Sequence, residues 1–144
     1  MKKILVTTDF SELADKAIGP AAELAQKLEA RLTLVHVLTS ERPPKPDPSA
    51  PYYKVALRMF EADQELEAQI RQNLQQRADA CPGDCKVAIA RGGAVSGLLA
   101  LAKEQQADMI VISSQGRSGL SRILLGSVAE ELARESPIPV LIWK

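Results

Sequence analysis

The chain has 144 residues, 46% hydrophobic and 25% charged, a composition typical of a globular domain with a sizeable core. It carries 18 Lys and Arg residues against 18 Asp and Glu residues, and this zero net charge argues against a nucleic-acid or polyanion binder that relies on bulk charge. No apolar run approaches the about 18 residues of a membrane span, and the N-terminus lacks the apolar region of a signal peptide. We therefore expect a cytoplasmic protein with neither a nucleic-acid nor a membrane partner.

The first half of the chain predicts two strands, a helix and a long loop. Residues 4–6 form an apolar strand that ends at 7–9. Apolar residues at three- and four-residue spacing then predict a helix over 13–28, with a kink or a break at Gly19-Pro20. Either Asp9 with Glu12, or Ser11 alone, could cap its start. Residues 32–38 predict a second strand, and the five prolines of 39–53 predict a loop without regular structure.

The second half alternates helices and strands. Apolar residues at helical spacing mark three helices. The first contains Ala62, Leu66, Ile70, Leu74 and Ala78, and the second covers residues 95–102. In the third, Val128 and Leu132 should face inward. The strands cover 86–90, 109–112 and 138–143. This alternation predicts one α/β domain over 1–144, with a five-stranded parallel sheet, helices on both faces and a probable strand order of 3-2-1-4-5.

In an open parallel sheet, ligands bind beyond the carboxyl ends of the strands, where the strand order reverses. For the order 3-2-1-4-5 this place lies between the first and fourth strands. The loops that meet there are residues 7–11 and 113–127. Any small-molecule site is therefore expected between these two loops.

The second of these loops contains glycines at an informative spacing. Nine residues separate Gly116 from Gly126-Ser127, which stands at the start of the last helix. A glycine lets a backbone approach a bulky anion closely, and the free N–H groups and dipole of a helix start favour a phosphate. A Gly-Ser pair is also ordinary turn and N-cap chemistry. The agreement between topology and local chemistry favours a phosphate cradle.

Several other side chains could have either a functional or a structural role. Asp9 could accept a ribose hydroxyl or bind magnesium, or it could cap the first helix, and these readings are equally weighted. Thr8 is interpreted first as a turn former. Arg117 and Arg122 are interpreted as solvated residues, although they could neutralise phosphate charge. His36 has no nucleophile or carboxylate placed to form a triad, so we expect a packed histidine.

The two cysteines, Cys81 and Cys85, are separated by three residues. This spacing is not that of the two-residue redox motif, and no second pair completes a zinc site. We interpret the segment as a turn with two reduced thiols. A redox-sensitive local disulfide is the alternative, and it would be transient in a reducing compartment.

The joint pattern resembles the universal stress protein family along nearly the whole chain. The resemblance rests on residues 3–11, the second-strand run 34–37, residues 107–112, the Gly116 to Glu130 segment with its nine-residue spacer, and the closing 137–142. It implies a Rossmann-like fold of the adenine nucleotide alpha hydrolase type. It also implies a homodimer through the C-terminal strand, residues 138–143, whose apolar edge would otherwise be a liability.

The ATP-binding members of this family share a motif of Gly, two residues, Gly, nine residues, Gly, and Ser or Thr. Here the motif falls on positions 113, 116, 126 and 127, and three of the four match. Position 113 is Ser, whose Cβ would crowd the ligand if the backbone there needed a positive φ. Because Gly126-Ser127 is retained, we place the chain with the nucleotide binders.

The resemblance also implies where an ATP or AMP molecule, with or without magnesium through Asp9, would lie. Asp9 and Val37 would lie near the adenine and ribose, residues 113–116 beside the ribose and α-phosphate, and residues 126–128 around the phosphates. The full set of expected contact residues is Thr7, Thr8, Asp9, Val37, Ile112, Ser113, Gln115, Gly116, Gly126, Ser127 and Val128.

Three functions fit these observations. The first is a regulator in the stress response that binds an adenine nucleotide, because no general base, nucleophile or metal cluster stands out and a cradle without them binds better than it reacts. The second is a slow ATPase in which Asp9, or a water held by it, takes part. The third is a protein-binding stress module that Ser113 has deprived of nucleotide affinity.

Overall fold

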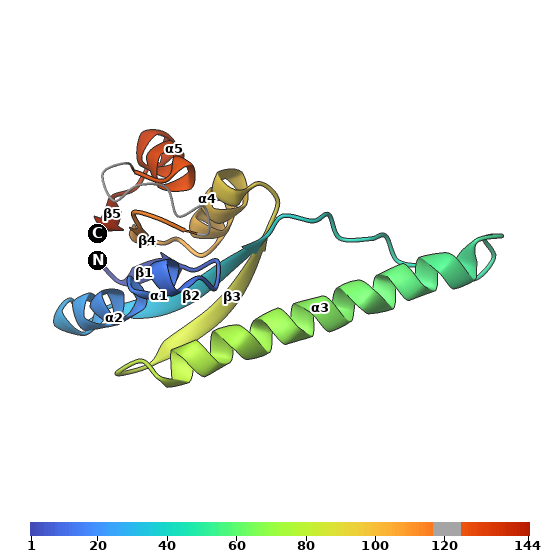
Figure 1. Cartoon of the computed structure of the whole chain (residues 1–144), viewed down its shortest axis with the longest axis horizontal. Helices are drawn as coiled ribbons and strands as arrows, with labels where there is room; N and C mark the ends of the chain where they lie inside the picture. The colour runs from blue at the N-terminus through green and yellow to red at the C-terminus, as the bar shows by residue number, and fades with distance from the viewer. Residues whose placement is uncertain (117–124) are drawn as a thin grey trace.

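The structure is a computed structural model that describes residues 1–116 and 125–144. Strands and helices alternate along these residues (Figure 1). The strands are β1 (Lys3–Thr7), β2 (Arg31–Leu38), β3 (Cys85–Arg91), β4 (Met109–Ser113) and β5 (Val140–Trp143). The helices are α1 (Glu12–Asp15), α2 (Ile18–Lys27), α3 (Tyr53–Asp79), α4 (Ala94–Glu104) and α5 (Ser127–Glu135).

The five strands form one parallel sheet in the order β3-β2-β1-β4-β5, which confirms the predicted fold class and strand order. Alternate residues of a strand point to opposite faces. Ile4 and Val6 accordingly join a core with α2 and α3, whereas Leu5 joins a second core with α4 and α5. Helices therefore cover both faces, as the sequence predicts.

The first predicted helix is two helices, and its break lies before the predicted position. α1 ends at Asp15 and α2 begins at Ile18, so Gly19-Pro20 lies inside the first turn of α2. Proline is tolerated there because the first N–H groups of a helix have no acceptor within the helix. Ser11 is the N-cap of α1, and its hydroxyl accepts a hydrogen bond from the Ala14 N–H at 3.1 Å.

Helix α3 begins earlier than its predicted pattern, at Tyr53, so the loop without helix or strand covers residues 39–52. Its buried residues, Ile70, Leu74 and Ala78, all lie in its C-terminal part, which packs on β2 and β3. Figure 1 shows its N-terminal half projecting beyond the sheet. Within the described residues, no helix combines the length and apolarity needed to cross a bilayer.

An ion-pair cluster fixes the middle of α3 to the end of β3. The Arg91 guanidinium donates to both carboxylate oxygens of Asp63 and to Glu67, each at 2.9 Å. Arg91 lowers the pKa of Glu67 through this hydrogen bond. The cluster anchors α3 at the point where its buried part ends.

Truncating the side chain that anchors α3 should destabilise the fold. The Leu74 side chain lies between α3 and the sheet and is 0% exposed. Leu74→Ala should therefore lower the free energy of unfolding by about 2–5 kcal/mol, because it leaves a cavity in the core. Leu66→Ala makes the same change at a position 41% exposed and should cost about 0.5 kcal/mol or less in dilute solution. Urea denaturation measures both. Equal losses would contradict the assignment of the core.

Candidate functional site

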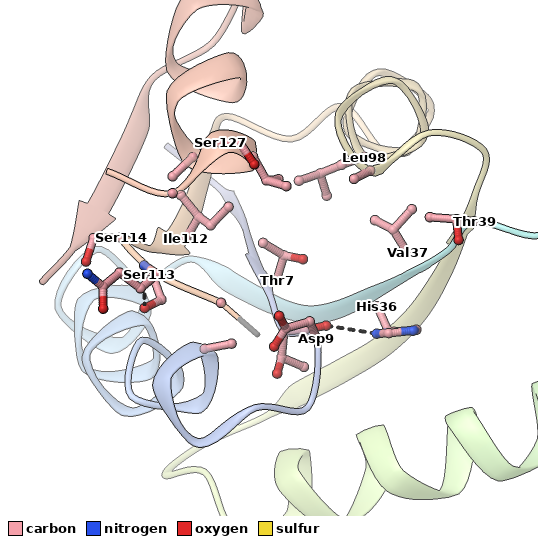
Figure 2. Close-up of a pocket in the computed structure, with 18 of the residues that line it drawn as sticks. Thr7, Asp9, His36, Val37, Thr39, Leu98, Ile112, Ser113, Ser114 and Ser127 are labelled. Atoms are coloured by element: carbon pink, nitrogen blue, oxygen red, sulfur yellow. Dashed lines mark hydrogen bonds between the residues drawn. The ribbon is translucent and has the colours of Figure 1, made fainter. Parts of the chain in front are cut away.

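A cavity of about 510 Å³ opens at the carboxyl ends of β1, β2 and β4 and is closed on its other sides by α1, α4 and α5 (Figure 2). This is the place where the strand order reverses, between β1 and β4. Every residue of the expected contact set lines it: Thr7, Thr8, Asp9, Val37, Ile112, Ser113, Gln115, Gly116, Gly126, Ser127 and Val128. The volume is that of an ordinary small-molecule site.

Ser114, which lies within the expected range 113–116, lines the cavity too. Seven lining residues were missed by the sequence reasoning. They come from α1, the end of β2 and the residue after it, α4 and α5: Ala14, His36, Leu38, Thr39, Ala94, Leu98 and Ala129. The reversal rule directs attention to the turns after β1 and β4 alone. All βα turns of a parallel sheet lie at the same edge, however, and that signal would have included the start of α4.

The Asp9 carboxylate lies against the backbone of Gly116. Its Oδ1 accepts a hydrogen bond from the Ser11 N–H at 2.9 Å, while a Cβ added at Gly116 would lie only 2.5 Å from Oδ2. A side chain at 116 would therefore have to displace the Asp9 carboxylate. Asp9 forms the turn that precedes α1 but is not its N-cap, because Ser11 holds that place.

The start of α5 presents backbone N–H groups to the cavity. Gly126 is the N-cap, and no side chain makes a capping hydrogen bond. Its own N–H donates to the Ser114 carbonyl at 2.7 Å, and a Cβ added there would lie 3.0 Å from that oxygen. The first-turn residues Ser127, Val128 and Ala129 line the cavity. Uncapped N–H groups and the positive end of the helix dipole favour an anion at this place.

The start of α4 has the same character. Gly93 is its N-cap, again without a capping hydrogen bond from a side chain, and Ala94 lines the cavity. Two helix starts thus meet one cavity. Among its lining residues in the described chain, only Asp9 and His36 carry ionisable side chains. Among the described lining residues, the positive potential comes from backbone groups and not from Lys or Arg side chains. Arg117 and Arg122 lie outside the described residues.

Ser113 does not need a positive φ, although its place at a glycine position of the motif made such a strain conceivable. The non-glycine residues with positive φ in the described chain are Phe10, Glu29 and Gln106, so Ser113 has an ordinary backbone. It ends β4, pairs with Trp143 of β5 and is 8% exposed. Serine therefore occupies this position without backbone strain.

Val128 does not face the core, which corrects the prediction that it points inward with Leu132. Its side chain is 38% exposed, whereas Ala129 and Leu132 are buried. The reason is that α5 begins at Ser127 with its Ala129–Leu132 face on the sheet. Val128 is left at the mouth of the cavity.

Thr8 and His36 line the cavity, and Phe10 packs behind them. The Thr8 hydroxyl donates to Asp15 Oδ1 at 2.6 Å and accepts from the Phe10 N–H at 3.0 Å, which confirms Thr8 as a turn former. The His36 ring stacks on Phe10 with centroids 4.4 Å apart, and its Nδ1 lies 2.9 Å from the Thr8 carbonyl oxygen (Figure 2). His36 is packed, as predicted, and it also lines the cavity.

The cysteines lie away from this site, at the turn between α3 and β3, and both are free thiols. Burial raises the pKa of Cys81 and raises that of Cys85 to about 12. Thiolate, the reactive form, is therefore scarce at neutral pH. This favours the interpretation as reduced thiols over the redox-sensitive disulfide. Among the described residues, no group of three His, Cys, Asp or Glu side chains is arranged to hold a metal ion.

The contact between Gly116 and Asp9 can be tested by a double-mutant cycle. Gly116→Ala should lower the free energy of unfolding by about 1–3 kcal/mol, because its Cβ displaces the Asp9 carboxylate. In an Asp9→Ala background the obstructing oxygen is absent, and the same substitution should cost less. Urea denaturation of the four proteins gives the coupling energy, which we expect to exceed about 0.5 kcal/mol. Additive losses would mean that the two residues do not touch.

Comparison with known proteins places this geometry in a family context. The model of the universal stress protein family matches residues 1–144. The stress response protein NhaX of Bacillus subtilis is 30% identical over 166 aligned positions, which cover 99% of this chain and 97% of that protein. The universal stress protein YxiE of the same organism is 29% identical and covers 97% of each chain.

Solved structures of universal stress proteins resemble this chain as well. That of hypothetical protein MJ0577, a universal stress protein of Methanocaldococcus jannaschii, superposes with a TM-score of 0.76 at 26% identity, covering 99% of this chain and 95% of that one. A universal stress protein solved in complex with cAMP superposes with a TM-score of 0.64 at 28% identity, covering 98% and 94%.

Proposed function

The chain belongs to the universal stress protein family, and we propose that it is a cytoplasmic, single-domain regulator that binds an adenine nucleotide, ATP or AMP, in the cavity between β1 and β4. The observation that carries this proposal is the uncapped start of α5 lining a nucleotide-sized cavity beside Gly116 and Gly126. A solved relative that is 28% identical holds cAMP, which is also an adenine nucleotide.

The proposed ligand fits the residues present. Asp9 would accept hydrogen bonds from the ribose hydroxyls, with Val37 against the adenine and residues 113–116 beside the α-phosphate. The N–H groups at 126–128 would hold the phosphates, because the helix dipole favours negative charge there. Magnesium would arrive with ATP, with Asp9 as the nearest carboxylate of the cavity.

Binding, rather than turnover, is the activity that this cavity supports. Asp9 packs on Gly116 and bonds the Ser11 N–H, and His36 stacks on Phe10. These two are the residues with ionisable side chains among the described lining residues, and both are held by these contacts. Since regulation needs only a change in a surface when the ligand binds, the loop at 39–52 is a suitable element: Thr39, at its start, lines the cavity.

We also propose a homodimer through the C-terminal strand, residues 138–143. β5 is the last strand of the sheet and pairs with β4 alone among the described strands. Its residues Val140, Leu141, Ile142 and Trp143 are apolar, and Trp143 is 41% exposed. An apolar edge of this kind is covered when two copies meet across a two-fold axis.

A negative charge at the start of α5 should weaken nucleotide binding without harming the fold. Val128 lies in the first turn of α5 and is 38% exposed, so Val128→Asp places a carboxylate beside the proposed phosphates. Acidic residues in a first helical turn stabilise the helix. We expect the dissociation constant for ATP, measured by calorimetry, to rise about tenfold or more through like-charge repulsion, with no fall in the thermal midpoint.

The matched control is Val128→Asn, which has nearly the same shape as the aspartate but no charge. It should bind ATP within about threefold of the wild type, because a neutral side chain at 128 does not repel the phosphates. If the two variants bind ATP equally well, the phosphates do not lie at the start of α5.

A further inference from the structure

The projecting half of α3 exposes an apolar stripe. Tyr52, Val55, Met59, Ala62 and Leu66 recur at intervals of three and four residues, which places them along one face of the helix. Tyr52 is 69% exposed, Val55 and Met59 are each 61% exposed, and Leu66 is 41% exposed. These five residues are called the outer stripe. Its spacing is that of a coiled-coil seam.

Intramolecular contacts occupy a different face of the same helix. Asp63 and Glu67 point to Arg91 at the end of β3, and Glu67 also pairs with Arg42 of the 39–52 loop. The stripe lies in the half of α3 that projects beyond the sheet (Figure 1), and its residues are exposed there. A helical segment of this length is marginal in water without packing. Something that covers the stripe would supply the missing burial.

The charges beside the stripe indicate what covers it. Lys54 and Arg58 stand near the start of α3, and Glu61 and Glu65 follow one to two turns later. Within the described residues none of these four forms an ion pair or a side-chain hydrogen bond. The segment thus has a basic end and an acidic end, both available, on one side of the stripe. Such a surface is complementary to a reversed copy of itself.

We propose that the outer stripe docks antiparallel against the outer stripe of a second copy of this chain. In one register, Val55 packs on Leu66 of the second copy and Met59 packs on its Ala62, so the apolar layers match throughout. In that same register Arg58, which precedes Met59, lies opposite Glu65, which precedes Leu66. The two-fold axis repeats each of these contacts, so two copies form two ion pairs beside the apolar seam.

A parallel arrangement satisfies the surface less well. It would bring Arg58 to Asp63 of the second copy, but Asp63 already receives both nitrogens of Arg91. It would also place both sheets at the same end of the helix pair, because each α3 carries its sheet at its C-terminal part (Figure 1). The antiparallel pair puts the two sheets at opposite ends of the helix pair.

This contact is separate from the β5 interface and from the nucleotide cavity. α3 and β5 lie at different parts of the molecule (Figure 1), and β3 and β5 are opposite edges of the sheet. A chain with two self-complementary surfaces assembles beyond a dimer. The inference depends neither on nucleotide binding nor on pairing through β5.

Charge reversal provides the test. Arg58→Glu makes both charges acidic and Glu65→Arg makes both basic, so each variant opposes like charges in the proposed register. Each substitution should weaken the association through α3 about tenfold. Sedimentation equilibrium should then give each variant the lower molecular mass that its remaining interfaces allow. An equimolar mixture of the two variants restores both pairs and should recover the wild-type mass. The double variant should recover it as well.

Gln64→Glu and Gln64→Arg are the controls, because they change charge on the face of α3 opposite the stripe, and they should leave the mass unchanged. If circular dichroism shows that a reversal variant loses helix, Met59→Ala, which keeps helix propensity, takes its place and should weaken association too. The proposal is wrong if the wild type has the same mass as the single variants. It is equally wrong if the mixture of the two reversal variants associates no better than either one alone.

Discussion

The site depends on the opposite directions in which the chain leaves two neighbouring strands. After β1 the chain passes to β2 on one side, and after β4 it passes to β5 on the other, so the βα connections diverge and leave an open space above the β1–β4 pair. Side chains cannot fill this space from below, because the strands are pleated and end there. The cavity at this edge follows from the strand order itself.

The same constraint decides what lines the cavity. Strand ends and helix starts bring backbone groups, short side chains and glycines to the rim, and the Asp9 carboxylate packs closely on Gly116. Both α4 and α5 begin there without a side-chain cap, so in the part of the site that the structure describes the positive potential comes from aligned peptide groups. Such a surface suits an anion of moderate size and needs no cluster of lysines or arginines, which agrees with the balanced charge of the chain.

The sequence predicted the sheet well because its strands are short apolar runs between loops, and parallel strands buried on both faces have that appearance. It predicted helix positions less well where local rules compete. The break was predicted at Gly19-Pro20 but lies near residue 16. The prediction failed because proline is tolerated in the first turn of a helix, which is where Pro20 lies in α2. The length of α3 was underestimated because its first half contributes nothing to the core.

For the cavity, the reversal rule indicated the loops after β1 and β4, and the family resemblance implied a set of contact residues that the fold does bring to one place. The contribution of α4 was missed, since Ala94 and Leu98 belong to no motif and reach the cavity only through the packing of that helix on the sheet. Val128 was assigned to the core from spacing alone, although spacing cannot fix which of two adjacent residues faces inward when the helix start is uncertain. Of the outer stripe, only Ala62 and Leu66 belonged to the predicted helical pattern, and only the structure shows that the first half of α3 projects beyond the sheet.

The most direct test of this account is a calorimetric titration of the wild-type chain, freed of any bound nucleotide, with ATP and separately with AMP. The account predicts saturable heat at about one nucleotide per chain, with a matching rise in thermal midpoint, because a ligand that binds only the folded state stabilises it. Absence of heat and of thermal stabilisation with both nucleotides at millimolar concentration would contradict the proposed nucleotide site.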